Sequence, residues 1–100
     1  MEFNVENLVV IHNTDENRFE VWIDGHLSKL DYTCHGSTFV ITHVGVYPEY
    51  RGWGVAGKLT RAGLDFAKAN SLRVLPMCSY AAAYIRRNPQ YAELTKHQEG

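Results

Sequence analysis

The sequence predicts an α+β fold with a mixed sheet, in which antiparallel strands come first and a helical crossover adds a parallel strand. Residues 18–33 alternate apolar and polar side chains around Asp24-Gly25, a dipeptide typical of a tight hairpin turn. Residues 53–69 place apolar side chains at spacings of three and four, as one face of a helix requires. The apolar segments 38–46 and 72–77 flank that helix, and this order indicates a parallel, right-handed connection.

The size and charge of the chain restrict its class. One hundred residues suffice for one hydrophobic core, so we expect a single domain over residues 1–100. A net charge of −1 argues against a nucleic-acid-binding or polybasic membrane surface. Cys34 and Cys78 form no C-x-x-C pair, the N-terminus does not resemble a signal sequence, and no apolar run reaches the ~20 residues that span a bilayer. We therefore expect a reduced, cytoplasmic protein.

Four strands are expected before the helix, three of them in the first third of the chain. The apolar, β-branched run within residues 5–12 predicts the first strand, and residues 18–23 and 26–33 predict the second and third. The second and third strands each present one mainly apolar face, so this part of the sheet should be covered on one side. The side chains expected on the covered face are Phe19, Val21, Ile23, Leu30 and Tyr32. The polar segments 13–17 and 34–37 are expected to be turns.

The fourth strand, residues 38–46, carries apolar side chains on both faces, which indicates a central position in the sheet. Strict alternation places Phe39, Ile41 and His43 on one face, and Val40, Thr42, Val44 and Val46 on the other.

Two helices are expected. The first contains Gly63 in its interior, and because glycine there costs about 1 kcal/mol relative to alanine, close packing against the sheet is a plausible reason for it. Ser79 is expected to cap a second helix that runs through Arg87 and is stopped by Pro89.

A glycine-rich turn joins the fourth strand to the first helix. Gly52, Gly54 and Gly57 permit positive φ angles and close approach of a ligand, and the helix leaves its first amides without intrahelical partners. These amides and the helix dipole favour an anion such as phosphate, and Arg51 and Lys58 add positive charge beside them.

The same turn has other interpretations. It could simply connect a strand to a helix. A nucleotide P-loop requires Ser or Thr after Gly57-Lys58, where this chain has Leu59, so that class is disfavoured. The dinucleotide fingerprint G-x-G-x-x-G matches literally, but beyond Asp65 no acidic residue stands near the distance that the fingerprint requires, which makes it a weak competitor.

Arg51-Gly52-Trp53-Gly54-Val55-Ala56 resembles the R/Q-x-x-G-x-G/A pyrophosphate loop of the GCN5-related N-acetyltransferases. The flanking segments strengthen the resemblance: Val44-Gly45-Val46 and Pro48-Glu49-Tyr50 before the loop, and Pro76-Met77-Cys78-Ser79-Tyr80, Tyr84 and Asn88-Pro89-Gln90-Tyr91 after it. Together, over residues 38–94, they are similar to the small, single-domain YjdJ-type branch of that superfamily.

The resemblance implies a GNAT-like sheet whose fourth and fifth strands splay apart and admit the pantetheine arm of acetyl-CoA. It implies cofactor contacts from Val44, Val46, Arg51, Gly52, Trp53, Gly54, Val55, Ala56, Gly57 and Lys58. Fuller members carry one or two helices between their first strands as a wall of the acceptor site, but here the connection is only residues 13–17. The acceptor side should therefore be open, and the identity of the acceptor cannot be inherited.

Acetyl transfer to an amine requires a base for the amine, a donor for the oxyanion and a donor for the departing thiolate. Cys78 follows the splayed strand, and it either protonates the thiolate, accepts the acetyl group itself, or is a small buried hydrophobe. His43 is a candidate base or a packing histidine. Tyr84 is a candidate donor to the sulfur, as the resemblance implies, or part of an aromatic core.

Other polar residues are weaker candidates. Glu49 could relay protons, although a carboxylate beside a turn is usually just solvated. Arg86 and Arg87 could meet the 3′-phosphate of CoA, but cations are favoured at any helix C-terminus. The five histidines show no ligand spacing, so no metal site is expected.

We predict an acetyl-CoA-binding N-acetyltransferase that moves acetyl to a primary amine of a small molecule or protein, either directly or through Cys78. Two other classes stay open. A non-catalytic acyl-CoA-binding module would explain a cofactor site without a clear acceptor pocket, and a partner-dependent subunit would explain exposed apolar surface near residues 18–35. Neither nucleic acid nor a membrane is expected as a partner.

Overall fold

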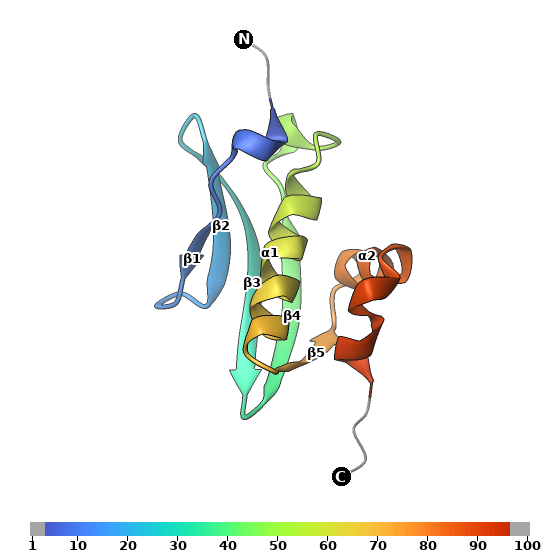
Figure 1. The fold of residues 1–100 in the computed structure, drawn as a ribbon. Coiled ribbons are helices and arrows are strands. Elements are labelled where there is room, and N and C mark those ends of the chain that lie inside the picture. The colour runs from blue at the N-terminus through green and yellow to red at the C-terminus, as the bar shows by residue number, and fades with distance from the viewer. Residues whose placement is uncertain (1–3, 97–100) are drawn as a thin grey trace.

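A computed structural model describes residues 4–96, which form one five-stranded sheet in the order β1-β2-β3-β4-β5 with helices α1 and α2 (Figure 1). The strands are β1 Ile11–Asn13, β2 Arg18–Ile23, β3 His26–His35, β4 Thr38–Gly45 and β5 Arg73–Pro76, and the helices are α1 Val55–Ala69 and α2 Ser79–Arg87. Neighbouring strands from β1 to β4 are antiparallel, whereas β4 and β5 are parallel. The predicted α+β fold with a mixed sheet is therefore confirmed.

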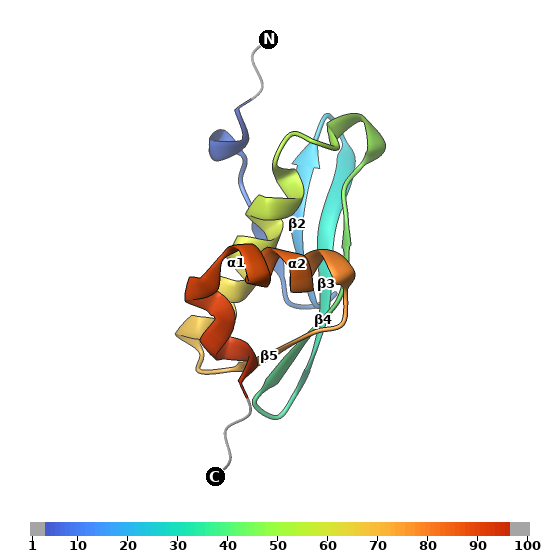
Figure 2. The ribbon, with the colours of Figure 1, turned by 90° about the vertical axis from the view of Figure 1, so that its right-hand side faces the viewer.

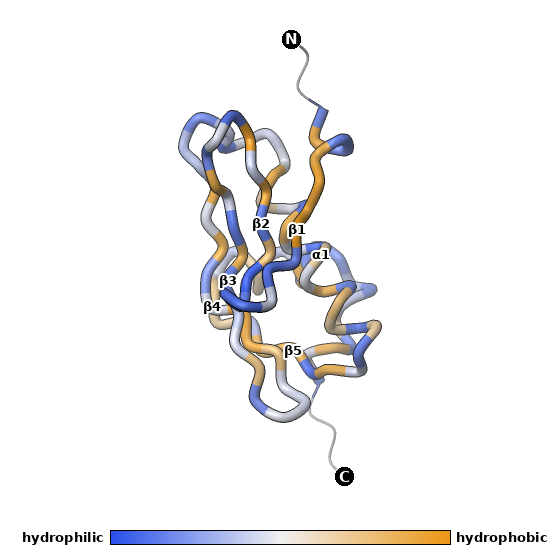
Figure 3. Tube along the Cα trace, turned by 90° about the vertical axis from the view of Figure 1, so that its left-hand side faces the viewer, coloured by the Kyte–Doolittle hydropathy of each residue, from blue (hydrophilic) through white to orange (hydrophobic). Residues whose placement is uncertain are grey.

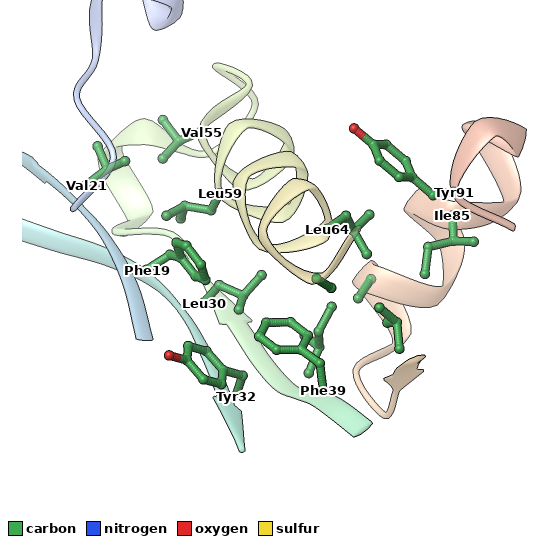
Figure 4. Close-up of a cluster of buried hydrophobic side chains, with 14 of the residues drawn as sticks. Phe19, Val21, Leu30, Tyr32, Phe39, Val55, Leu59, Leu64, Ile85 and Tyr91 are labelled. Atoms are coloured by element: carbon green, nitrogen blue, oxygen red, sulfur yellow. The ribbon is translucent and has the colours of Figure 1, made fainter. Parts of the chain in front are cut away.

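Helix α1 covers one face of the sheet, as the view in Figure 2 shows, and α2 lies beside it. Side chains from both layers meet in the core that Figure 4 displays. The largest fully buried apolar side chains are Phe39, Leu30, Ile41, Leu59, Leu64, Val21, Val55 and Val74. A Cβ atom on Gly63 would stand 3.3 Å from Cδ1 of Leu30, so the expected close approach of this glycine to the sheet is confirmed.

The first strand is shorter than predicted. Residues Val5–Asn7 form a 3₁₀ turn, because the Asn4 side chain accepts a hydrogen bond from the Glu6 amide and caps it. Pairing with β2 covers only Ile11–Asn13. No helix lies between β1 and β2 in the structure, since residues 14–17 connect them directly.

The ends of other elements also shift by a residue or two. Strand β3 continues through residues 34 and 35, so the turn to β4 comprises only Gly36 and Ser37. Helix α1 begins at Val55, two residues later than expected. In α2, Ser79 is the first helical residue and Cys78 is the N-cap, without a side-chain hydrogen bond, so the expected Ser79 cap is wrong.

A β-bulge changes the face on which His43 lies. Asp31 pairs with His43, but the next residue of β3, Tyr32, pairs with Ile41, so Thr42 is an extra residue in β4. Beyond it the alternation is inverted: Val44 stands opposite the buried Leu30, and His43 is exposed on the other face. The expectation that His43 shares a face with Ile41 is therefore wrong.

On the sheet face opposite α1, the carboxylate of Glu20 is buried and has hydrogen-bond donors around it. Glu20 is only 4% exposed and accepts hydrogen bonds from Arg18 Nε at 2.5 Å, Asn13 Nδ2 at 3.0 Å and Trp22 Nε1 at 3.1 Å. Burial alone would raise the pKa of Glu20, but these hydrogen bonds outweigh it, and the pKa is lowered.

Hydrophilic and hydrophobic residues alternate along the strands of the sheet (Figure 3). Among residues 4–96, no helix is long and apolar enough to cross a membrane.

Candidate functional site

The glycine-rich turn brings the first amides of α1 to the end of β4. After the 3₁₀ turn Pro48–Tyr50, the backbone takes left-handed conformations at Gly52 (φ +83°) and at Gly54 (φ +88°), which is the N-cap of α1. The first bond of the helix ladder runs from the Lys58 amide to the Gly54 carbonyl over 3.1 Å. The preceding helical amides, residues 55–57, have no carbonyl one turn earlier within the helix to bond.

A pocket of about 250 Å³, which we term the loop pocket, lies over these amides. It is lined by Val46, Tyr50, Arg51, Gly52, Gly54, Val55, Ala56, Gly57 and Tyr80. Most residues proposed as cofactor contacts therefore meet here; Val44, Trp53 and Lys58 do not line the pocket. Oriented amides and the positive end of the α1 dipole suit a phosphate at this position.

The two basic residues of the turn lie on different sides. Arg51 is exposed, and its Nε donates to the Val46 carbonyl over 3.4 Å. Lys58 instead reaches the N-terminal segment, where its Nζ donates to the Glu6 carbonyl over 3.0 Å. Arg51 thus adds positive charge to the loop pocket, whereas Lys58 serves the opposite flank of α1.

Strands β4 and β5 diverge close to the loop pocket. Their parallel pairing ends with Ile41 opposite Pro76, followed by a hydrogen bond from the Met77 amide to the Ile41 carbonyl over 3.0 Å. Strand β4 continues to Gly45, while the chain after β5 turns toward α2 (Figures 1 and 2). The bulge at Thr42 coincides with this divergence, and past it β5 no longer pairs with β4.

Cys78 and His43 both stand just beyond the last paired position, on different sides. Cys78 is half-buried and packs against the core beneath the helices. His43 is exposed on the open face of the sheet, which is the face that α1 does not cover. Its Nε2 lies 2.7 Å from the place that a Cβ on Gly45 would occupy. The two candidate residues therefore flank the divergence of the strands from the helix side and from the open side.

Two tyrosines of α2 approach Gly57 of α1. The Tyr80 hydroxyl is 3.6 Å, and Tyr84 Cε2 is 3.8 Å, from the position of a Cβ on Gly57. Tyr80 lines the loop pocket, whereas Tyr84 lines a second pocket and has a pKa raised by burial. The resemblance pointed to Tyr84 and not to Tyr80, although Tyr80 belongs to the Cys78-Ser79-Tyr80 segment and lies in the first turn of α2.

The weaker candidates lie elsewhere. Glu49 is exposed in the 3₁₀ turn, and Arg86 and Arg87 are exposed in the last turn of α2. None of the three lines the loop pocket. Within residues 4–96, no group of three His, Cys, Asp or Glu side chains is arranged to hold a metal ion.

Comparisons with known proteins show the family of the chain. A family model described as GCN5-related N-acetyl-transferase matches residues 18–94. Protein NATD1 from Mus musculus and from Homo sapiens are both 34% identical to the chain over 89 residues, which cover 84% of it and 81% and 79% of the relatives. NATD1 from Danio rerio is 30% identical over 95 residues, covering 90% of the chain and 86% of the relative.

A solved structure shares the fold. The NMR solution structure of a GCN5-like protein from Staphylococcus aureus superposes with a TM-score of 0.71 at 27% sequence identity. The match covers 93% of this chain and 95% of that protein.

Proposed function

Because the chain belongs to the GCN5-related N-acetyltransferase family, we propose that it binds acetyl-CoA at the loop pocket and transfers the acetyl group to a primary amine. One observation carries this proposal: the free first amides of α1 open into a pocket that also contains Val46 and Tyr80, beside the point where β4 and β5 diverge. A pyrophosphate would accept hydrogen bonds from these amides, with Arg51 supplying a balancing charge. The finer YjdJ-type assignment and the cytoplasmic location stay predictions.

The pantetheine arm would extend from the loop pocket along β4. Past Ile41 the edge of β4 has no partner in β5, so backbone groups near Val44 and Val46 are available to the amides of pantetheine. The pantetheine arm would thus pair with the edge of β4 through the same backbone hydrogen bonds that another β-strand would form there. The thioester would then lie near the divergence of the two strands, close to Cys78.

In the direct reaction, the amine nitrogen attacks the thioester carbonyl and the C–S bond of the tetrahedral intermediate breaks. We infer that His43 takes the proton from the amine, which would approach from the open face of the sheet. The departing thiolate requires a proton from the helix side. We assign this role to Tyr80 in place of Tyr84, because Tyr80 follows Cys78 by two residues in the first turn of α2, whereas Tyr84 lines the second pocket.

Cys78 offers a second route. Its thiolate would attack the thioester, release CoA and hold the acetyl group until the amine takes it. Intact mass spectrometry after mixing the protein with acetyl-CoA tests this route, with Cys78→Ala as the control. A gain of one acetyl group that is absent in Cys78→Ala supports the covalent intermediate; transfer to an amine without any adduct supports direct attack.

The short connection between β1 and β2 favours an exposed acceptor or a non-catalytic role. Fuller family members place helices there, but in this chain residues 14–17 leave that side without a wall. The test is release of free CoA in the presence of a diamine, an aminoglycoside or a lysine peptide. Turnover that His43→Gln and Tyr80→Phe abolish would support the enzyme. Tight CoA binding without turnover on any amine would favour an acyl-CoA-binding module.

A further inference from the structure

Three apolar side chains lie together on the open face of the sheet, where β4 and β5 diverge. Val40 stands between the buried Phe39 and Ile41, so it faces away from α1, and Leu75 pairs directly with it. The Met77 amide continues the pairing with a bond to the Ile41 carbonyl over 3.0 Å, so alternation puts Met77 on the same face as Leu75. We term Val40, Leu75 and Met77 the apolar strip.

The apolar strip is open to solvent. Leu75 is 40% exposed and Met77 is 66% exposed, although the next residue of β5, Val74, lies in the core. Neighbouring large apolar side chains that stay exposed are typical of a surface that binds something.

The apolar strip leads to His43. Met77 is bonded to Ile41, and the next two residues of β4 are Thr42, the bulge residue, and His43 on the open face. The Thr42 hydroxyl holds the bulge in place, because it donates to the Asp31 carbonyl over 3.1 Å. A molecule whose amino group meets the His43 ring could therefore rest its remaining atoms on the strip.

Toward β3, the open face is charged, but its carboxylates already have cationic partners. Asp31 stands opposite His43, and its carboxylate forms a 3.2 Å ion pair with Lys29. Glu20, the other carboxylate of the five described strands, is buried and accepts three hydrogen bonds, one of them from an arginine. A second ammonium group near His43 would thus meet Lys29 together with Asp31, and gain little.

We propose that the acceptor is a primary monoamine with an apolar body, and that Leu75 and Met77 bind this body and determine the specificity of the reaction. The assignment rests on the proposed function, in which the amine approaches His43 from the open face. An apolar body gains free energy by covering the strip, and the flexible thioether of Met77 contacts aromatic rings well. Polyamines and aminoglycosides should be poor acceptors, because a charged group pays for lost hydration on such a surface.

Release of CoA from acetyl-CoA in the presence of simple amines tests the proposal. Hexylamine and cadaverine have nearly the same length and shape, but one ends in a methyl group and the other in a second ammonium group. The value of kcat/KM should be at least about tenfold higher for hexylamine. From propylamine to hexylamine it should rise about twofold with each methylene group, as expected for groups that are covered on one side.

Two substitutions at exposed positions test the strip itself. Met77→Gln and Leu75→Thr should each lower kcat/KM for hexylamine about threefold and leave the value for propylamine unchanged. The loss should appear as a higher KM with an unchanged kcat, because the strip would contact substrate and transition state equally. Val9→Thr is the matched control, since Val9 is 74% exposed beside β1, at the opposite edge of the sheet from β5.

A binding measurement tests the strip without turnover. The chain contains two methionines, so methyl-labelled methionine gives two signals in an NMR spectrum, and Met77→Gln identifies the one from Met77. Phenethylamine, titrated in the presence of CoA, should shift this signal, because its ring would lie against the Met77 methyl group.

The outcomes separate this proposal from the proposed function. Equal kcat/KM for hexylamine and cadaverine, or a Met77 signal that phenethylamine leaves in place, would overturn the role of the apolar strip and leave acetyl transfer intact. A shifted Met77 signal without release of CoA to any amine would support the strip as the amine-binding surface and contradict acetyl transfer itself.

Discussion

The buried Ser28 hydroxyl of β3 accepts a hydrogen bond from the Tyr47 amide over 2.9 Å. This bond joins the middle strand of the sheet to the chain just after β4, where the path to the glycine-rich turn begins. The position of the loop pocket therefore depends on a polar side chain within the sheet.

Replacing Ser28 with alanine should destabilise the fold and loosen the loop. The Tyr47 amide would lose its partner in a place that water reaches poorly, which costs about 1–3 kcal/mol. Urea denaturation measures that cost, and CoA affinity should fall with it. Ser37→Ala, in the exposed turn between β3 and β4, is the matched control. Equal stability of the two variants would contradict a structural role for the Ser28 hydroxyl.

Stability should decline in mild acid because of His12. Its ring stacks on Phe19 at 4.1 Å, its Nε2 lies 2.6 Å from the Tyr32 hydroxyl, and burial lowers its pKa from the ordinary value of 6.5. The unfolded chain thus takes up the proton more readily than the folded one, so the free energy of unfolding decreases as the pH falls below 6.5.

The slope of unfolding free energy between pH 7 and pH 5 measures this effect, and His12→Gln should flatten it. His35→Gln, which alters an exposed histidine at the end of β3, should leave the slope as it is. A slope that survives in His12→Gln would assign the acid sensitivity to another group.

The Tyr91 hydroxyl ties the C-terminal 3₁₀ segment, Pro89–Thr95, to α1. It donates to Asp65 Oδ1 over 2.6 Å, and burial together with this bond raises the pKa of Tyr91 to about 12. A raised tyrosine pKa stabilises the fold fully below pH 10, the ordinary value, and this stabilisation is lost as the pH rises through about 12. Tyr91→Phe should cost about 1–2 kcal/mol at neutral pH.

Chemical denaturation measures the cost in Tyr91→Phe, and ultraviolet titration of tyrosine should lose its latest-ionising component in that variant. A titration curve identical to that of the unmodified protein would show that Tyr91 ionises with the exposed tyrosines.

Much of the fold follows from local patterns. Alternation and Asp24-Gly25 identify the β2–β3 hairpin, in which Asp24 and Gly25 both take positive φ angles, at +50° and +78°. Helical spacing identifies α1, and Pro89 marks the end of α2. These features were predictable because each depends on residues close together in the sequence.

The errors arise where distant residues decide the geometry. The bulge at Thr42 depends on the register between β3 and β4, so alternation alone put His43 on the wrong face. The burial of Glu20 is tolerated because Arg18 and Trp22 on its own strand and Asn13 on β1 donate to its carboxylate, and no periodicity of apolar residues reveals these bonds. Tyr80 becomes a site candidate only once α2 is packed beside Gly57.

If the first amides of α1 bind the pyrophosphate of CoA, the variant Ala56→Asp should bind CoA more weakly. The positive end of the helix dipole stabilises a carboxylate at the second helical position, so the variant should fold at least as stably as the unmodified protein. The same charge would repel a pyrophosphate in the loop pocket, which Ala56 lines. Gln90→Glu adds an equal charge at an exposed site outside that pocket and is the control.

The measurement is a calorimetric titration of CoA into the three proteins. We predict binding to the unmodified protein and to Gln90→Glu with similar affinity, and binding to Ala56→Asp at least about tenfold weaker, the effect of losing about 1.4 kcal/mol. Equal affinity for all three proteins would contradict the placement of the pyrophosphate at α1.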